Sequence, residues 1–253
     1  VLTHLKQHDM LEEYITFVIH KAVVYFRLKN LTLASHELSE IAKIIEEHAT
    51  ASQKIRYYNP LPSIQNETKN DAQAYQYLTT AQYLAQKVDD KKRLIQIYHN
   101  LSLYFYNNGD LENSLLYAKK SIAYDLELPE RTNNYLQIML DFVVILLKAM
   151  QIEEAMQVLN QVKPIIEQAD INQNYVKLRI TESFVLEAQG QINHSYSLLL
   201  KTIAQCQQDI HWLEELYGRL CQLSKQRMIK EDYLNDLKNY MAVKLQVSEQ
   251  QKK

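Results

Sequence analysis

The sequence has very few of the residues that end helices and form tight turns. Its 253 residues include only 3 Gly and 4 Pro, beside 47% hydrophobic and 23% charged residues. All-β and α/β folds need many turns, which glycine and proline largely supply. Their scarcity argues against those folds and predicts an all-α protein. Since no Gly-rich or Pro-rich linker divides the chain, we expect one repeat domain over residues 1–253, with residues 1–10 a linker or the end of an upstream domain.

Cysteine and excess positive charge are also scarce. The two cysteines, Cys206 and Cys221, lack the spacing of a metal site or a disulfide framework, and no signal segment precedes them. The expected compartment is therefore a reducing cytoplasm. A formal net charge of −2 without a cluster of Lys and Arg argues against binding to nucleic acid or to an anionic membrane.

Motifs for catalysis and metal binding are weak. His4 and His8 lie four residues apart beside Asp9, and Cys206 with His211 resembles a thiolate pair, but neither set has a clear further ligand or orienting group. Core packing explains the cysteine better, because cysteine is often buried. The chain contains no glycine-rich phosphate loop, HExxH or GxSxG motif. We expect no metal, no cofactor and no enzymatic activity.

One segment is apolar nearly all round and raises the question of a membrane span. It covers residues 135–150, which are 16 residues with Asp141 and Lys148 among them. A span requires roughly 20 predominantly apolar residues. The segment therefore predicts a helix buried between neighbouring helices.

A helical hairpin is predicted around one of the rare glycines, in the stretch NNGD. Apolar residues follow helical spacing from Leu94 to Phe105, and the phase restarts after the turn at Leu111. Gly109 can end the first helix in a left-handed conformation that glycine adopts readily, and the Asp110 carboxylate can cap the second. A small residue, Ser114, then lies where two closely packed helices would cross.

Equivalent small positions recur along the chain at intervals of 40 or 41 residues. They are Ala34, Ala74, Ser114, Ala155, Ser195 and, less well, Asp236. Four residues later come Leu38, Leu78, Ala118, Leu159, Leu199 and Tyr240, and three residues after those come Ile41, Ala81, Ser121, Val162, Thr202 and Val243. A phase kept through about six units predicts stacked helical hairpins, because a single hairpin cannot bury its own faces.

The unit resembles the tetratricopeptide repeat, although its period exceeds the about 34 residues of the ordinary repeat. Its first helices are then expected to line a concave surface of a right-handed superhelix. Lys69, Met150 and Lys230 or Glu231 stand where glycine is expected. Pro164 should kink or restart its helix.

A stripe opposite the packing face carries the candidate binding residues. In the third repeat Gln96, Asn100, Leu103 and Asn107 lie on one line of a helix. The same phase gives Thr16, His20, Val23 and Arg27 in the first repeat. The predicted peptide-binding residues are Gln96, His99, Asn100, Leu103, Tyr106, Asn107, Gln137, Asp141, Lys148, Lys177, Thr181 and Phe184.

An asparagine amide can pair with both the C=O and the N–H of an extended peptide. We therefore expect Asn100 and Asn107 to bind a peptide backbone and to contribute little to folding. The alternative is that these amides cap or bridge helices, or that the stripe is an ordinary solvated face.

The repeat style and the Tyr- and Asn-rich, glycine-poor composition resemble the repeat domain of the RNPP family of Gram-positive peptide-pheromone regulators. That resemblance implies a cytoplasmic quorum-sensing transcription regulator whose repeat domain binds a short signalling peptide and frequently dimerises. DNA would be bound only through an N-terminal domain absent from this chain, which begins with Val. The alternative function is a general tetratricopeptide protein-interaction scaffold or a response-regulator inhibitor. A domain of a larger signalling enzyme is the least favoured alternative.

Overall fold

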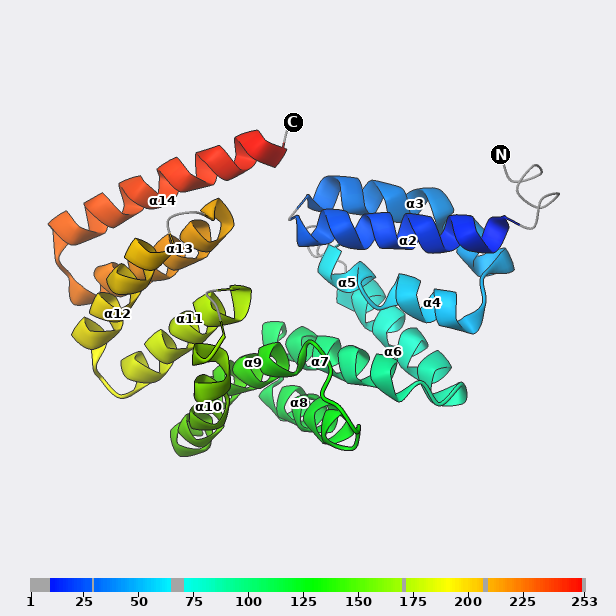
Figure 1. Ribbon diagram of the computed structural model, residues 1–253, viewed down its shortest axis with the longest axis horizontal. Coiled ribbons are helices and arrows are strands. Elements are labelled where there is room, and N and C mark those ends of the chain that lie inside the picture. The colour runs from blue at the N-terminus through cyan, green and yellow to red at the C-terminus, as the bar shows by residue number, and fades with distance from the viewer. Residues whose placement is uncertain (1–9, 29, 65–70, 170–171, 207–208, 252–253) are drawn as a thin grey trace. The chain divides into compact units, whose positions relative to one another are not determined.

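Helices joined by short turns make up the described part of the protein. The computed structural model describes residues 10–28, 30–64, 71–169, 172–206 and 209–251, and within these ranges it contains helices and no strand (Figure 1). The prediction of an all-α fold is therefore confirmed. Contacts divide the chain into two compact units, unit 1 (Val1–Thr132) and unit 2 (Asn133–Lys253).

Each unit is a series of helices joined by short connections. Unit 1 contains α2 (Leu11–Arg27), α3 (Leu31–His48), α4 (Ala51–Tyr58), α5 (Leu61–Ile64), α6 (Asp71–Lys87), α7 (Lys91–Asn107) and α8 (Leu111–Leu126). Unit 2 contains α9 (Tyr135–Lys148), α10 (Ile152–Glu167), α11 (Gln173–Ala188), α12 (Ile192–Gln205), α13 (Ile210–Arg227) and α14 (Lys230–Gln251).

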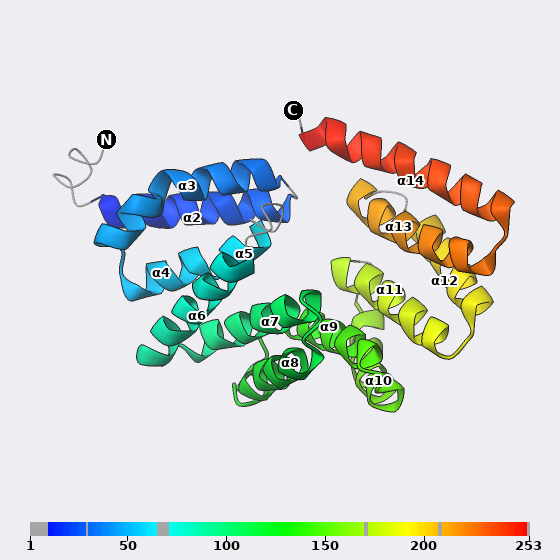
Figure 2. The ribbon, with the colours of Figure 1, turned by 180° about the vertical axis from the view of Figure 1, so that it is seen from behind.

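These helices pack in pairs as hairpins. α2 packs on α3, α4 on α6, α7 on α8, α9 on α10, α11 on α12, and α13 on α14. Figures 1 and 2 both show α7 and α8 side by side. We call the first helix of each hairpin its A helix (α2, α4, α7, α9, α11, α13) and the second its B helix. The predicted tetratricopeptide-like hairpins are confirmed.

The hairpin of α7 and α8 forms as predicted. Gly109 has φ +79, and the Asp110 carboxylate accepts from the backbone N–H of Asn113 at 3.1 Å. The Ser114 hydroxyl donates to the backbone carbonyl of Ser102 at 2.9 Å, across the crossing of the two helices. Ser195 makes the same 2.9 Å bond to the Ser183 carbonyl in the α11–α12 hairpin. The small residue therefore allows the close approach that lets its hydroxyl reach the partner backbone.

The recurring slots point into the cores of the units. Among the small positions, Ala34, Ser114, Ala155, Ser195 and Asp236 are buried, and Ala74 is partly buried. Asp236 is accommodated in its slot because its carboxylate accepts a 2.9 Å hydrogen bond from the Tyr196 hydroxyl. Tyr240 and Val243, the later slots of the last repeat, are only partly buried.

Three features of the turns and helices differ from the prediction or lie beyond it. The left-handed residue before α14 is Met228, with φ 56, so Lys230 and Glu231 do not take the place of the glycine. Met150, with φ 61, does occupy such a position. Lys69 lies outside the described residues. α10 continues through Pro164 to Glu167 as one helix, so the expected restart does not occur.

The apolar segment from Tyr135 forms α9, a helix of unit 2 that is largely buried. Ile138, Leu140, Val143 and Leu146 are at most 1% exposed. Among the described residues, no helix has both the length and the hydropathy required to cross a membrane.

Candidate functional site

The predicted residues of unit 1 lie on α7 at different depths. Gln96, Asn100, Leu103 and Tyr106 are partly buried, and Asn107 at the end of the helix is exposed. His99 is buried. The opposite face carries Leu94, Ile97 and Leu101 into the core, as the apolar spacing predicted. The partly buried and exposed side chains are therefore the ones that a ligand could reach.

Asn100 bridges two A helices. Its Nδ2 donates to the side-chain oxygen of Asn59 at 2.9 Å and to the Asn59 backbone carbonyl at 3.2 Å. Asn59 follows directly after α4. Two donors of Asn100 are thus used within the protein, and its Oδ1 remains as the acceptor it can offer. The expectation that Asn100 contributes little to folding therefore needs correction.

A second amide connects α4 with α2. The Gln53 side chain, which is 4% exposed, donates to the backbone carbonyl of Glu12 at 3.0 Å and to the Thr16 hydroxyl at 3.3 Å. Thr16 belongs to the stripe predicted for the first repeat. The polar stripes of α2, α4 and α7 are thus joined to one another, and we call the surface they share the unit 1 A-helix face.

Between these two amide contacts lies a group of basic side chains. Arg56 of α4 donates a hydrogen bond to Nε2 of His20 on α2. Arg93 of α7 is close enough that its positive charge contributes to lowering the pKa of both Arg56 and His20. We call His20, Arg56 and Arg93 the basic triad. It brings together one group from each of three A helices.

The triad is short of negative charge. Among the described residues no carboxylate forms an ion pair with Arg56, and Arg93 has only Asp90, at 3.8 Å. Partial burial is the main cause that lowers the pKa of Arg56, and burial followed by the charges of Arg56 and Arg93 lowers that of His20. Neutral His20 can accept the Arg56 hydrogen bond, whereas a protonated imidazole could not.

Sequence reasoning missed Arg56, Arg93 and Asn59. A signal for Arg93 was available, because it lies three residues before Gln96 and extends the α7 stripe by one turn. Arg56 and Asn59 belong to the second repeat, for which no stripe was assigned. Their relation to α7 becomes visible only when the hairpins are stacked.

In unit 2 three of the predicted residues, Asp141, Lys177 and Thr181, are engaged with one another. Lys177 of α11 forms an ion pair with Asp141 of α9, with the ammonium nitrogen 2.8 Å and 2.9 Å from the two carboxylate oxygens. Thr181 is 1% exposed and its hydroxyl donates to the Lys177 carbonyl at 2.8 Å. Gln137 is partly buried and Lys148 is exposed.

Phe184 is also engaged, by an arginine of the next A helix. The Arg219 guanidinium lies 3.8 Å from the Phe184 ring centroid, and its Nε donates to the Ser183 hydroxyl at 2.8 Å. It also pairs with Glu187, which accepts a further bond from Gln226 at 2.5 Å. Burial would raise the pKa of Glu187, but the hydrogen bonds from Arg219 and Gln226 lower it below the ordinary value.

The cysteines have the chemistry of core residues. Cys206 is 2% exposed, and burial raises the pKa of its thiol. Burial likewise raises the pKa of Cys221 to about 11. Neither shift favours a thiolate at neutral pH. His4, His8 and Asp9 lie outside the described residues, and within the described ranges no group of three or more His, Cys, Asp or Glu residues could hold a metal ion.

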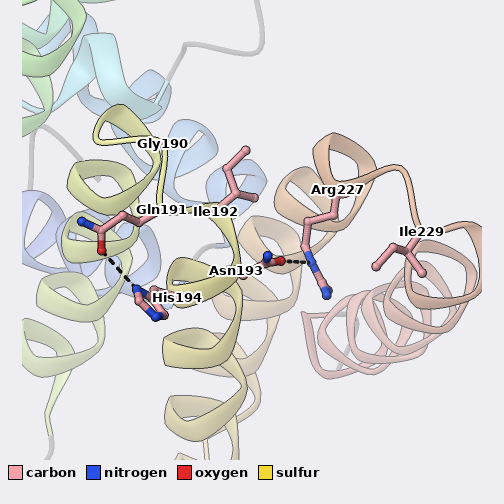
Figure 3. Close-up of a pocket in the computed structure, with 7 residues that line it drawn as sticks. All are labelled: Gly190, Gln191, Ile192, Asn193, His194, Arg227 and Ile229. Carbon is pink, nitrogen blue, oxygen red and sulfur yellow. Dashed lines mark hydrogen bonds between the residues drawn. The ribbon is translucent and has the colours of Figure 1, made fainter.

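A pocket lies in unit 2 beside the turns that precede α12 and α14 (Figure 3). Its volume is about 550 Å³, and its lining residues are Gly190, Gln191, Ile192, Asn193, His194, Arg227 and Ile229. Figure 3 shows Arg227 bonded to Asn193 and Gln191 bonded to His194. Arg227 also pairs with Asp232 at 2.8 Å and stacks on Tyr196. Most of its polar side chains are thus already paired.

The fold is that of the tetratricopeptide-repeat proteins. A crystal structure of a Rap protein complexed with Competence and Sporulation Factor is similar over 94% of this chain and 66% of that one, with a TM-score of 0.76 and 18% identity. The apo form of RapI is similar over 87% of this chain and 65% of that one, with a TM-score of 0.56 and 12% identity. The chain thus spans about two thirds of these two proteins.

Other similar structures belong to the same structural class. A tetratricopeptide repeat protein from Parabacteroides merdae is similar over 94% of this chain and 87% of that one, with a TM-score of 0.56 and 15% identity. No family model and no curated protein sequence matches the chain.

Proposed function

We propose that this chain is a peptide-binding repeat domain that uses the unit 1 A-helix face. The observation that carries the proposal is that α2, α4 and α7 together present amide and basic side chains outside the hydrophobic core of unit 1. Partly buried polar groups of this kind can bind the backbone of an extended peptide whatever its side chains are. The likeness to a Rap protein complexed with Competence and Sporulation Factor supports the same choice.

In its specific form the proposal is a cytoplasmic peptide sensor of a transcription regulator, in keeping with the resemblance to the RNPP family. DNA binding, dimerisation and the regulated promoter would then depend on parts outside this chain or on a second copy. The predicted residues of unit 2 remain candidates for further contacts. A general interaction scaffold or a response-regulator inhibitor is the alternative, which the likeness to a tetratricopeptide repeat protein of broader class favours.

The test begins with a selection of peptides. A displayed library of random five- to ten-residue peptides is selected on the purified chain, and the affinity of the enriched peptides is measured by isothermal titration calorimetry. We expect Gln96→Ala and Asn107→Ala to weaken binding about 5- to 150-fold, the equivalent of roughly 1–3 kcal/mol for one lost hydrogen bond.

Asn108→Ala is the matched control for Asn107→Ala. Asn108 is also an exposed asparagine, but its side chain donates to the Tyr104 carbonyl of its own helix at 2.9 Å. It should bind like the unmodified chain. Selection of no peptide, or equal affinity for all three variants, would reject peptide binding on this face and favour the scaffold.

A further inference from the structure

The basic triad carries more positive than negative charge. Hydrogen bonding to a peptide backbone, the role proposed for the A-helix face, does not require this excess. Arg56 is partly buried, and its only hydrogen-bond partner among the described residues is the neutral ring of His20. A partly desolvated cation ordinarily has a carboxylate beside it, because burial without one is unfavourable. The charge that does act on Arg56, and lowers its pKa after burial, is instead that of another arginine, Arg93.

Two carboxylates that contact α2 or cap α7 already have partners. Asp90 lies 3.8 Å from Arg93, and its side chain also accepts the backbone N–H of Arg93 at 3.0 Å as the cap of α7. Glu37, the acidic partner of the neighbouring α2 cation Lys21, is bound to it at 2.7 Å. Several amides of this face already have partners, as Gln53 with Thr16 and Asn59 with Asn100 show.

We propose that His20, Arg56 and Arg93 form a binding site for a carboxylate of the bound peptide. This inference rests on the proposed peptide-binding function and adds a chemical requirement to it. An arginine offers parallel N–H donors that match the two oxygens of a carboxylate, and two arginines from adjacent helices can address one such group. The ligand therefore carries an acidic side chain or a free C-terminus at the position that meets α4.

A carboxylate would also relieve the repulsion within the triad. The positive charges of Arg56 and Arg93 repel each other in the free protein, and an anion between them adds two attractive interactions that outweigh this one repulsion. Binding at this place should accordingly weaken as salt is added, because the interaction is in part between accessible charges.

Three pentapeptides test the chemistry without knowledge of the natural ligand. The first is acetyl-Ala-Ala-Glu-Ala-Ala-amide, the second replaces Glu with Gln, and the third is acetyl-pentaalanine with a free C-terminal carboxylate. The readout is the arginine Nε–Hε NMR signals during titration. We expect the Glu peptide or the free-carboxylate peptide to shift the signals of Arg56 and Arg93, and the Gln peptide to bind at least tenfold more weakly. The responding peptide identifies the acidic side chain or the C-terminus as the source.

Variants show whether the triad is the site. Arg56→Gln and Arg93→Gln should each weaken binding of the responding peptide roughly 10- to 100-fold, as expected for the loss of a charge-assisted hydrogen bond. Lys92→Gln removes the same charge from an exposed neighbouring position of α7 and should bind as before. If Arg56→Gln does not fold, Arg93→Gln still decides, because its side chain is 34% exposed.

Failure of the inference is separable from failure of the proposed function. If selected peptides bind but their amidated, Gln-substituted forms bind equally well, the carboxylate site is wrong and peptide binding stands. If the carboxylate probes shift the two arginines and the library gives no peptide, the anion site stands and the peptide function fails. Equal response to all three probes, or no response to any of them at millimolar concentration, would overturn the inference.

Discussion

The A helices of the two units present polar faces of opposite character. In unit 2 the charges are paired: Asp141 with Lys177, and Arg219 with Glu187. In unit 1 Arg56 and Arg93 lie near each other, and Arg56 donates its hydrogen bond to the neutral ring of His20. Breaking a buried ion pair is strongly destabilising, whereas a partly buried cation without a carboxylate, such as Arg56, is unfavourable in the free protein. The proposed recognition on the unit 1 A-helix face would account for this difference.

The largest effect that would test this difference is expected from Arg219→Ala in unit 2. Arg219 is 5% exposed, and its removal takes the guanidinium from Glu187, which keeps only the Gln226 donor, and from the Ser183 hydroxyl. We expect a loss of about 3 kcal/mol in the free energy of unfolding, as when one partner of a largely buried pair is removed. Urea denaturation measures it. A change within roughly 0.5 kcal/mol, the spread of ordinary surface substitutions, would show that the unit 2 pairs do not stabilise the fold.

A smaller loss is expected from Asn100→Ala in unit 1. The substitution leaves the Asn59 oxygens without a donor in a partly buried place, which should lower the free energy of unfolding by about 1 kcal/mol. Asn107→Ala should be nearly neutral, since Asn107 is exposed. Thermal melting of both variants measures the contrast. Equal melting temperatures would mean that the Asn59 bridge contributes nothing to stability.

The loss of stability at acidic pH should depend in part on Glu187 of unit 2. The pKa of Glu187 lies below its ordinary value of 4.5 in the folded state, so its pairing stabilises the fold above that value. The stabilisation is lost as pH falls through the lowered folded pKa, because the unfolded chain binds the proton more readily. Denaturation midpoints between about pH 5 and pH 2 should fall less steeply for Glu187→Gln than for the unmodified chain. Identical slopes for the two proteins would show that the pairing of Glu187 does not contribute to stability.

The smallest effect on stability is expected from Arg56→Gln. This variant tests the contrast between Arg56 of unit 1 and Arg219 of unit 2 most directly. Removing a cation that faces another cation should leave the melting temperature of the free protein unchanged or slightly higher. A loss comparable to that of Arg219→Ala would show that Arg56 is a structural residue with a partner. The two arginines would then be equivalent, and the contrast between the units would disappear.

Much of the fold could be predicted from particular residues, and less of the site. Gly109, Ser114 and Asp110 predict their hairpin because turn, crossing and cap depend on local sequence. The turn at Met228 was placed too late by counting back from Asp236, since the left-handed turn lies eight residues before this buried anchor, against five from Gly109 to Ser114. The periodicity of the stripe identified Thr16, His20 and Asn100 as surface residues of one phase.

The partners of those residues could not be read from the sequence. Asn59 contacts α7 and Arg56 contacts α2 because the short helix α4 lies between them. The first part of the second repeat is divided into two short helices, α4 and α5, in which the helical phase is hard to follow. Sequence spacing gives the face of one helix, but not the side chain that a neighbouring helix brings to it. The charge imbalance of the triad is therefore a property of the stacked hairpins.

The central claim is that ligands bind the unit 1 A-helix face. The most direct test is a backbone amide NMR titration with a peptide taken from the selection. The account predicts that the largest shifts fall on α2, α4 and α7, near His20, Arg56, Asn59 and Arg93. Shifts confined to α9, α11 and α13, or to the B helices, would contradict it.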